Sequence, residues 1–126
     1  MNRRIMLGAA LLTGTAGSAA LASPVPLHPD AALIALCQAH PALVDALNSD
    51  DRDCDDSNPH WVAYEASRKA ISAARPQTLA GMRAKALAAK AEALMPDGSE
   101  SYDGTTAGVW ASDLLHDVLR ATGGAA

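Results

Sequence analysis

The chain has 126 residues, of which 49% are hydrophobic and only 3% aromatic, and it carries a formal net charge of −4. This length suits one domain, and the acidic balance argues against nucleic acid and anionic membranes as partners. Much of the apolar content is alanine, which favours helix but buries little surface. The sequence therefore predicts a thin core, for which a protein partner or a homo-oligomer would compensate.

Residues 1–22 have the pattern of an export signal. Arg3 and Arg4 give a basic start, an apolar stretch follows, and Ala20 and Ala22 are small residues of the kind that precede a signal-peptidase site. The other interpretation is a retained membrane anchor, which needs about 20 predominantly apolar residues and is weakened here by Gly, Thr and Ser. We predict cleavage after Ala22 and a periplasmic or secreted mature protein with no membrane association.

The arginine pair leaves two export routes open. Followed by Ile5, Met6 and Leu7, it resembles a twin-arginine signal, which exports proteins that have already folded. Two arginines are also common at the start of signals for the unfolded-chain pathway, and phenylalanine is missing after this pair. The sequence predicts export by either route.

After an extended, proline-rich leader at 23–29, the chain shows helical periodicity in four segments and no alternation typical of a strand. Pro59, Thr78 and Thr105 or Thr106 are favourable helix starts, and the glycines that follow the last segment favour a helix end. We expect an all-α domain at 30–122 and a short tail at 123–126. The predicted bundle has about four helices, near 30–48, 59–74, 78–94 and 105–121.

In the first helix the apolar residues recur at spacings of three and four through Pro41, which removes one backbone donor and predicts a kink. His40 lies within the same stripe, and a lone histidine there is typical of a satisfied core or boundary residue rather than a ligand. The residues of the stripe are Leu33, Leu36, Cys37, Leu43, Val44 and Leu47.

Cys37 and Cys54 are the two cysteines of a chain that we expect to leave the reducing cytoplasm. A disulfide between them would close a short loop and stabilise the fold by about 3 kcal/mol. In the competing interpretation, Cys37 is a small buried apolar residue of the first helix. We predict the disulfide, which requires the two Cα atoms to lie within about 7 Å of each other.

The acidic loop at 50–58 contains the strongest metal-binding pattern in the sequence. Asp51, Asp53 and Asp55 alternate as the first ligands of a calcium loop do, but the turn glycine and the bidentate glutamate of that motif are missing. Residues 53–59 also resemble the start of MopE-like metal-binding repeats, without their cysteine-rich continuation. We predict a solvated linker, with a Ca²⁺ site at the three aspartates as the alternative.

Helical wheels predict which faces of the later helices point inward. The expected inward residues are Val62, Ala63, Ala66, Ala70, Ile71 and Ala74, then Leu79, Met82, Ala86, Leu87, Ala93 and Leu94, and finally Trp110, Ala111, Leu114, Leu115, Val118 and Leu119. Glu65 is expected outside, paired with Arg68 and Lys69. Lys85 and Glu92 are expected on the outer side of the third helix.

Arg83 and Lys90 fall inside the predicted apolar arc of the third helix. Their stems can lie on apolar neighbours while the charges reach an acidic helix. Asp113 and Asp117 on the last helix are the expected partners, and such an ion pair is favoured over an anion-binding strip.

The segments HPDAALIALC and TLAGMRAKA, the second following Arg75-Pro76, and the Trp110-containing last helix resemble a loosely defined set of small alphaproteobacterial proteins. Many members carry similar arginine-pair export signals, and some are of prophage or mobile-element origin. The resemblance spans most of the mature chain, but it rests on helix starts and core positions. It implies export and a helical fold, and it supplies no activity, cofactor or catalytic residue.

The sequence contains no motif for nucleophilic, metal-hydrolytic or phosphate-cradling catalysis. We therefore predict an exported, non-catalytic interaction or structural module without a cofactor. The alternative is a periplasmic divalent-cation binder that uses the loop at 50–58.

Overall fold

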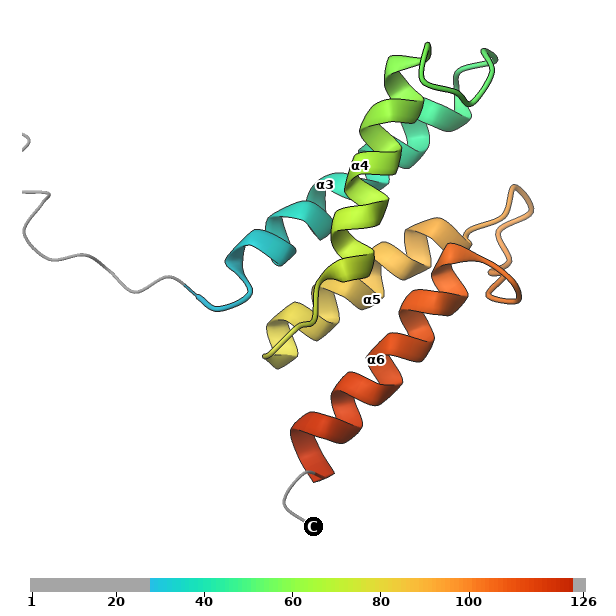
Figure 1. Ribbon diagram of the computed structural model, residues 1–126. Helices are drawn as coiled ribbons and strands as arrows, with labels where there is room; N and C mark the ends of the chain where they lie inside the picture. Colours follow the sequence, from blue (N-terminus) through green and yellow to red (C-terminus); the bar gives the residue numbers. More distant parts are fainter. Residues whose placement is uncertain (1–27, 124–126) are drawn as a thin grey trace, which may run out of the picture.

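The computed structural model describes residues 28–123, and these fold into four α-helices with no β-strand among them (Figure 1). The helices are α3 (Ala31–Asn48), α4 (Pro59–Ala73), α5 (Leu79–Ala93) and α6 (Thr106–Gly123). The prediction of a small all-α bundle is confirmed, and each helix begins and ends within two residues of its expected position.

Local sequence chemistry sets where the helices begin. The Asn58 side chain accepts a hydrogen bond from the His60 N–H at 2.9 Å, and Pro59 occupies the first turn of α4. At the start of α5, the Thr78 hydroxyl accepts from the Gly81 N–H at 3.1 Å. These side chains supply acceptors to the N–H groups that the first turn of a helix leaves unpaired.

Helix α5 is the centre of the bundle, because it packs against both α3 and α6, while α4 packs against α3. Figure 1 shows α6 at an edge of the molecule beside α5, and the loop between α3 and α4 projecting beyond the ends of those two helices. Helix α6 therefore has one outer flank with no helix beside it in the part of the chain that the structure describes.

The apolar core is thin, as the composition predicted, and polar side chains share the interior with it. The apolar cluster consists of Leu33, Cys37, Ile71, Ala88, Ala89 and Trp110. The buried polar and charged residues are Asp30, His40, Asn58, Ser67, Lys85 and Asp117. Because buried polar groups need partners, this composition makes the arrangement of hydrogen bonds as important to the fold as apolar packing.

The predicted inward face of α5 is partly wrong, since Met82 and Ala93 are buried as expected but three leucines are exposed. Leu79, Leu87 and Leu94 are 75%, 47% and 60% exposed, whereas Lys85 is fully buried and Glu92 is half-buried. The apolar part of the buried face is made of Gly81, Met82, Ala88, Ala89 and Ala93. Small side chains let the backbone of a central helix approach two neighbours closely, and hydropathy alone does not register that advantage.

The predicted orientation of α6 is also partly wrong. Trp110 is fully buried as expected, but Leu115 and Leu119 are each 59% exposed and Val118 is 40% exposed. Asp117, which was expected on the outer side, is fully buried. A helix with one main neighbour buries a single sector, and in α6 that sector includes the acidic side chains that meet buried Lys85.

Helix α4 buries little of its predicted apolar face. Ile71 is fully buried, but Val62 is 46% exposed and the polar Ser67 is buried instead. The predicted surface ion pairs are confirmed, because Glu65 lies 2.6 Å from Arg68 and 4.0 Å from Lys69.

Helix α3 continues through Pro41 and buries Leu33, Cys37 and His40, so its predicted inward face is confirmed. It is also the one helix within residues 28–123 that is long and apolar enough to cross a membrane, with a mean hydropathy of 1.2. In the bundle it packs against α4 and α5, and 17% of its residues are buried.

Asp30 joins the start of α3 to the start of α5. Its carboxylate accepts hydrogen bonds from the Gln77 N–H at 3.0 Å and from the N–H and hydroxyl of Thr78 at 2.8 and 2.6 Å. A Cβ at position 81 would lie 2.1 Å from this carboxylate, so the contact requires Gly81. Burial alone raises the pKa of Asp30, but these hydrogen bonds outweigh it and hold the pKa below its ordinary value.

Candidate functional site

A buried hydrogen-bonded cluster centred on His40 connects three helices. The imidazole is fully buried, with Nδ1 2.8 Å from the Ser67 hydroxyl of α4 and Nε2 2.6 Å from the Glu92 carboxylate of α5. The Tyr64 hydroxyl donates to the other Glu92 oxygen at 3.0 Å. The prediction that His40 is a satisfied core residue is confirmed, and we call these four side chains the His40 cluster.

Trp110 brings the fourth helix into contact with this cluster. Its ring meets the His40 ring edge-on, with centroids 5.3 Å apart, and its indole N–H donates to the Ser72 hydroxyl at 2.8 Å. The order serine, histidine, carboxylate is that of a nucleophilic triad, but Ser67 is only 6% exposed. We therefore interpret the cluster as a connection between helices.

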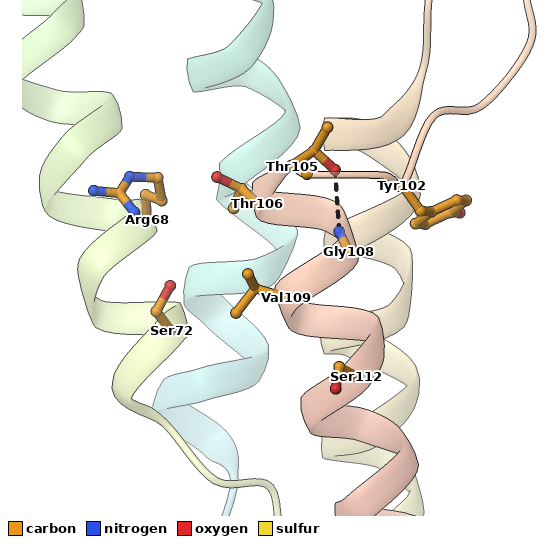
Figure 2. A pocket seen from close by; sticks show the side chains of 9 residues that line it. Arg68, Ser72, Tyr102, Thr105, Thr106, Gly108, Val109 and Ser112 are labelled. Carbon is orange, nitrogen blue, oxygen red and sulfur yellow. Dashed lines mark hydrogen bonds between the residues drawn. The ribbon is translucent and has the colours of Figure 1, made fainter.

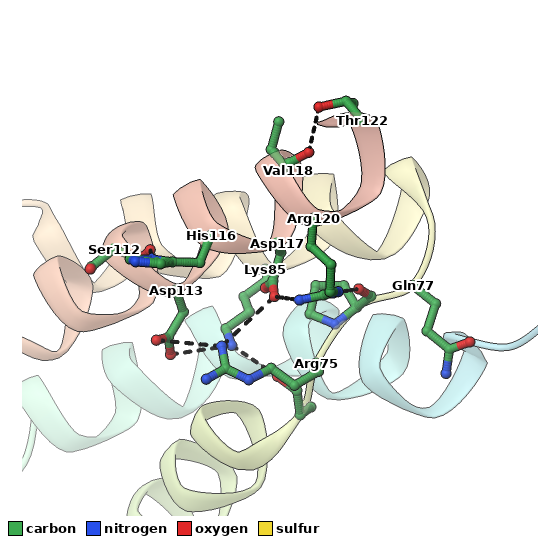
Figure 3. A network of polar contacts seen from close by, with 12 residues as sticks. Arg75, Gln77, Lys85, Ser112, Asp113, His116, Asp117, Val118, Arg120 and Thr122 are labelled. Atoms are coloured by element: carbon green, nitrogen blue, oxygen red, sulfur yellow. Dashed lines mark hydrogen bonds and ion pairs between the residues drawn. The ribbon is translucent and has the colours of Figure 1, made fainter. Parts of the chain in front are cut away.

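A second cluster consists of charged groups around buried Lys85, between α5 and α6, and is shown in Figure 3. Lys85 is fully buried, donates to the Ala74 carbonyl at 3.0 Å and lies 3.8 Å from the Asp113 carboxylate. Burial lowers the pKa of Lys85, and the charges of Asp113 and Asp117 oppose that shift. Together with Arg75 and Arg120, these three residues form what we call the Lys85 cluster.

Asp117 is the incompletely satisfied member of the Lys85 cluster. Its Oδ1 accepts from Arg120 at 2.8 Å and lies 3.8 Å from Arg75, while its Oδ2 is buried and has no hydrogen-bond partner within residues 28–123. The predicted pairing of Asp113 and Asp117 with Arg83 and Lys90 is wrong for this reason: Lys85, and not those two exposed residues, faces α6.

Lys90 instead pairs with Glu100 in the loop between α5 and α6. Because Lys90 is exposed and paired within the loop, the structure gives no basis for a continuous strip of basic side chains on α5.

A cavity of about 650 Å³ lies between α4 and the start of α6 (Figure 2). Its lining includes Arg68 and several hydroxyl groups, a combination that suits an anion. However, the Arg68 guanidinium already donates to Glu65 at 2.6 and 2.9 Å, and the Thr105 hydroxyl accepts from the Gly108 N–H at 3.1 Å. The charge of Arg68, which an anion would need, is thus already paired within the chain.

The aspartates of the acidic loop stay exposed. Asp51, Asp53 and Asp55 all face solvent, and the Asp55 carboxylate accepts from the backbone and hydroxyl of Ser57 at 2.9 and 2.5 Å. No group of three or more His, Cys, Asp or Glu side chains in the described range is arranged to hold a metal ion. The structure therefore gives the Ca²⁺ alternative no support.

Asp50, which the sequence did not single out, is the acid of this loop that contacts Arg52 and His60. Arg52 donates to it at 2.7 Å and His60 lies 2.8 Å from it. The hydrogen bonds from Arg52 hold the pKa of Asp50 well below its ordinary value. The signal that would have found it is its spacing of two from an arginine and ten from a histidine across the loop.

The predicted disulfide is wrong in this structure, because Cys37 and Cys54 are both free. Cys37 lies in the apolar core on α3, while Cys54 is exposed in the loop that follows that helix. Eleven residues of α3 after Cys37 correspond to about 16 Å along the helix axis, which carries the loop away from the core position. The competing interpretation of Cys37 as a small buried residue is the one that fits.

The predicted signal residues Arg3, Arg4, Ala20 and Ala22 lie outside the described residues, as do most of the leader and the last three positions of the tail. Their assignment to export remains a prediction from the sequence.

The outer flank of α6 carries a stripe of apolar and small side chains. Ala111, Leu115, Val118 and Thr122 follow one another at spacings of four, three and four, and Leu119 lies beside them. All five are exposed. A groove of about 290 Å³ between α5 and α6, which Ala111 also lines, borders this stripe. We call these five residues the α6 stripe.

No protein-family model, curated protein or solved structure matches the chain. Function is therefore inferred from the described side chains and from the export pattern of the sequence.

Proposed function

We propose that the protein is an exported, non-catalytic helical module that self-associates through the α6 stripe. The observation that carries the proposal is the exposure of Leu115, Val118 and Leu119 along one flank of a helix that packs against α5 through another face. Contiguous exposed apolar side chains of this kind mark interaction surfaces. The thin core gives a small domain a further reason to bury surface against a partner.

A second copy of the chain is the occupant that the spacing favours. Spacings of four, three and four are those of the seam of a two-helix coiled coil. If two α6 helices pair antiparallel, Leu115 lies opposite Val118 of the second copy, and Ala111 lies opposite Thr122. The large side chains then meet at the centre of the interface, and the small ones let the helix ends approach.

Export is supported by residues 1–22, with their basic start, apolar stretch and small residues before the expected cleavage site. N-terminal sequencing of the protein recovered from the envelope should begin at Ser23. Replacing Arg3 and Arg4 by lysine should block export by the twin-arginine route and leave the unfolded-chain route working. A protein that keeps its N-terminus and stays in the cytoplasm would contradict the export proposal.

The self-association is tested by sedimentation of the purified protein over a range of concentrations. The double variant Leu115→Lys/Val118→Lys should shift the population toward monomer, because two charges would be buried at the interface. The matched control, Val109→Lys/His116→Lys, places the same charges on exposed positions of the same helix away from the α6 stripe and should associate as the unchanged protein does. A monomer at all concentrations overturns self-association.

A photo-reactive residue placed at position 115, with exposed position 109 away from the α6 stripe as its control, identifies the occupant in cells. Adducts of twice the chain mass at position 115 alone support the proposal. An adduct of another mass at position 115 replaces the second copy with a different protein, and equal labelling at both positions overturns the surface.

A further inference from the structure

A cavity of about 590 Å³ lies where α3, α4 and the end of α5 meet, and it borders the His40 cluster. Two aromatic side chains, Trp61 and Tyr64, line it together with apolar side chains and the carboxylate of Glu92. No lysine or arginine is among the side chains that line it. The apolar lining includes Val44, Leu47 and Leu94.

Glu92 is held in place by two donors. Its side chain is 11% exposed, one carboxylate oxygen is 2.6 Å from His40 Nε2, and the other accepts from the Tyr64 hydroxyl at 3.0 Å. Each oxygen of a carboxylate has capacity for a further acceptor contact. The acid is therefore fixed in position at the cavity wall and still able to accept from a ligand.

The His40 imidazole can pair with Ser67 and Glu92 at the same time. The Ser67 hydroxyl can donate to Nδ1, and Nε2–H can then donate to Glu92. This tautomer satisfies both nitrogens of the imidazole. Glu92 is the one charged side chain among the residues that line the cavity.

The aromatic walls of the cavity also attract cations. The ring centroids of Trp61 and Tyr64 lie 5.9 Å apart, with an angle of 31° between the ring planes. The faces of such rings carry partial negative charge and attract ammonium groups. Apolar neighbours suit the alkyl part of a ligand, and a neutral apolar ligand would shield Glu92 from water without replacing its solvation.

We propose that this cavity binds a small organic cation, an alkylammonium group, with Glu92 as its counter-ion and Trp61 and Tyr64 as its aromatic walls. The proposal is independent of self-association, because the cavity is lined by α3, α4, α5 and the loop after α5, and by no residue of α6. Failure of one proposal therefore leaves the other standing.

The test compares choline with its uncharged isostere 3,3-dimethylbutan-1-ol on the unmodified protein, followed by tryptophan fluorescence and calorimetry. We expect choline to bind, and the alcohol to bind at least about tenfold more weakly, because it lacks the charge that the carboxylate and the rings attract. Equal binding of the two compounds overturns the proposal. So does the absence of choline binding up to the highest choline concentration at which the protein stays in solution. n-Butylammonium shows whether N–H donors improve on the quaternary group, and it should also bind more tightly than the alcohol.

Two variants assign the site. Glu92→Gln keeps the size of the side chain but removes its charge, and Trp61→Leu removes one aromatic wall. Choline binding by the Trp61→Leu variant is measured by calorimetry. Each should weaken choline binding by about tenfold. Glu100→Gln, an exposed acid outside the cavity, is the matched control and should bind choline as the unmodified protein does. Circular dichroism confirms that each variant folds, and unchanged choline binding by folded Glu92→Gln overturns the assignment.

Discussion

The His40 cluster and the Lys85 cluster lie in the same small bundle but are satisfied in different ways. In the His40 cluster, both ring nitrogens and both Glu92 oxygens have partners at 2.6–3.0 Å. In the Lys85 cluster, the ammonium lies 3.8 Å from Asp113, and Asp117 Oδ2 has no partner within residues 28–123. One cluster depends on directed hydrogen bonds, whereas the other depends mainly on attraction between charges.

This difference predicts how each cluster responds when a substitution removes one of its groups. A hydrogen-bonded chain fails locally, since removing one group leaves its two neighbours unsatisfied. A buried charge cluster fails collectively, because removing one charge leaves the opposite charges uncompensated in a medium that solvates them poorly. The variants below separate these two behaviours.

The largest effect is expected from Lys85→Met. In this variant the carboxylates of Asp113 and Asp117 keep only Arg75 and Arg120 as cationic partners, and both arginines are mostly exposed. We expect a loss of about 3–5 kcal/mol in the free energy of unfolding, measured by urea denaturation. Adding Asp117→Asn to Lys85→Met should restore part of the loss, because it removes one uncompensated charge. Lys69→Met, at an exposed lysine of α4, is the control and should change stability by less than about 0.5 kcal/mol. Equal stability of Lys85→Met and this control would show that the cluster does not hold α5 to α6.

A smaller loss is expected from His40→Leu, which fills the core but leaves Ser67 and Glu92 without the imidazole. We expect about 2 kcal/mol, since Glu92 keeps Tyr64 and limited contact with water. His116→Leu, at an exposed histidine of α6, is the comparison variant in the same urea experiment. If both histidine variants unfold at the same denaturant concentration, the His40 cluster is not a structural connection.

Asp30 provides a buried carboxylate that is fully hydrogen-bonded, in contrast to Asp117. Its pKa is lowered in the folded protein relative to 3.8, so its contribution to stability is complete above about pH 4 and is lost as pH falls through the folded-state pKa. Asp30→Asn should cost about 1 kcal/mol near neutral pH and reduce the acid-side loss. Thermal melts between about pH 2 and pH 7, an interval that includes the ordinary pKa of a carboxyl group, measure both effects. An unchanged acid-side slope in the variant would contradict this role.

The smallest effect concerns Cys37, whose thiol lies in the electrostatic field of Lys85. Burial raises the pKa of Cys37 to about 11, and Lys85 acts in the opposite direction. In native protein without reductant, Cys54 should react rapidly with a thiol reagent and Cys37 slowly, with both reactive after unfolding. In a Cys54→Ser background, Lys85→Met should move the alkaline onset of Cys37 labelling to higher pH, if the variant is studied while it remains folded. If the unfolded protein has no free thiols, Cys37 and Cys54 form the disulfide that the sequence predicted.

Helix boundaries could be predicted from the sequence because their causes are local. Asn58, Pro59 and Thr78 start helices through contacts within three residues, and the prediction for these boundaries is confirmed to within two residues. The inward face of α3 was also predictable, since Leu33, Cys37 and His40 lie on one apolar stripe. Local chemistry and a clear period were sufficient for these features.

The candidate sites could not be predicted, because each depends on which face of α5 lies inward. Glu92 and Lys85 were expected outside on the basis of charge, yet they anchor the two buried clusters. Trp61 and Tyr64 are three residues apart in a chain with few aromatic residues, and that spacing is the one signal that pointed to a shared wall. Their cavity exists only because α3 and α5 meet α4 at this place.

The sequence by itself determined a chain of four helices with an export pattern before them. Tertiary structure alone decided that α5 turns its small residues, Lys85 and Glu92 inward, and that α6 leaves Leu115 and Leu119 outside. The physical reason is that an alanine-rich helix has only a weak hydrophobic preference for one face. Close packing of small side chains and partners for buried polar groups on neighbouring helices then decide its orientation.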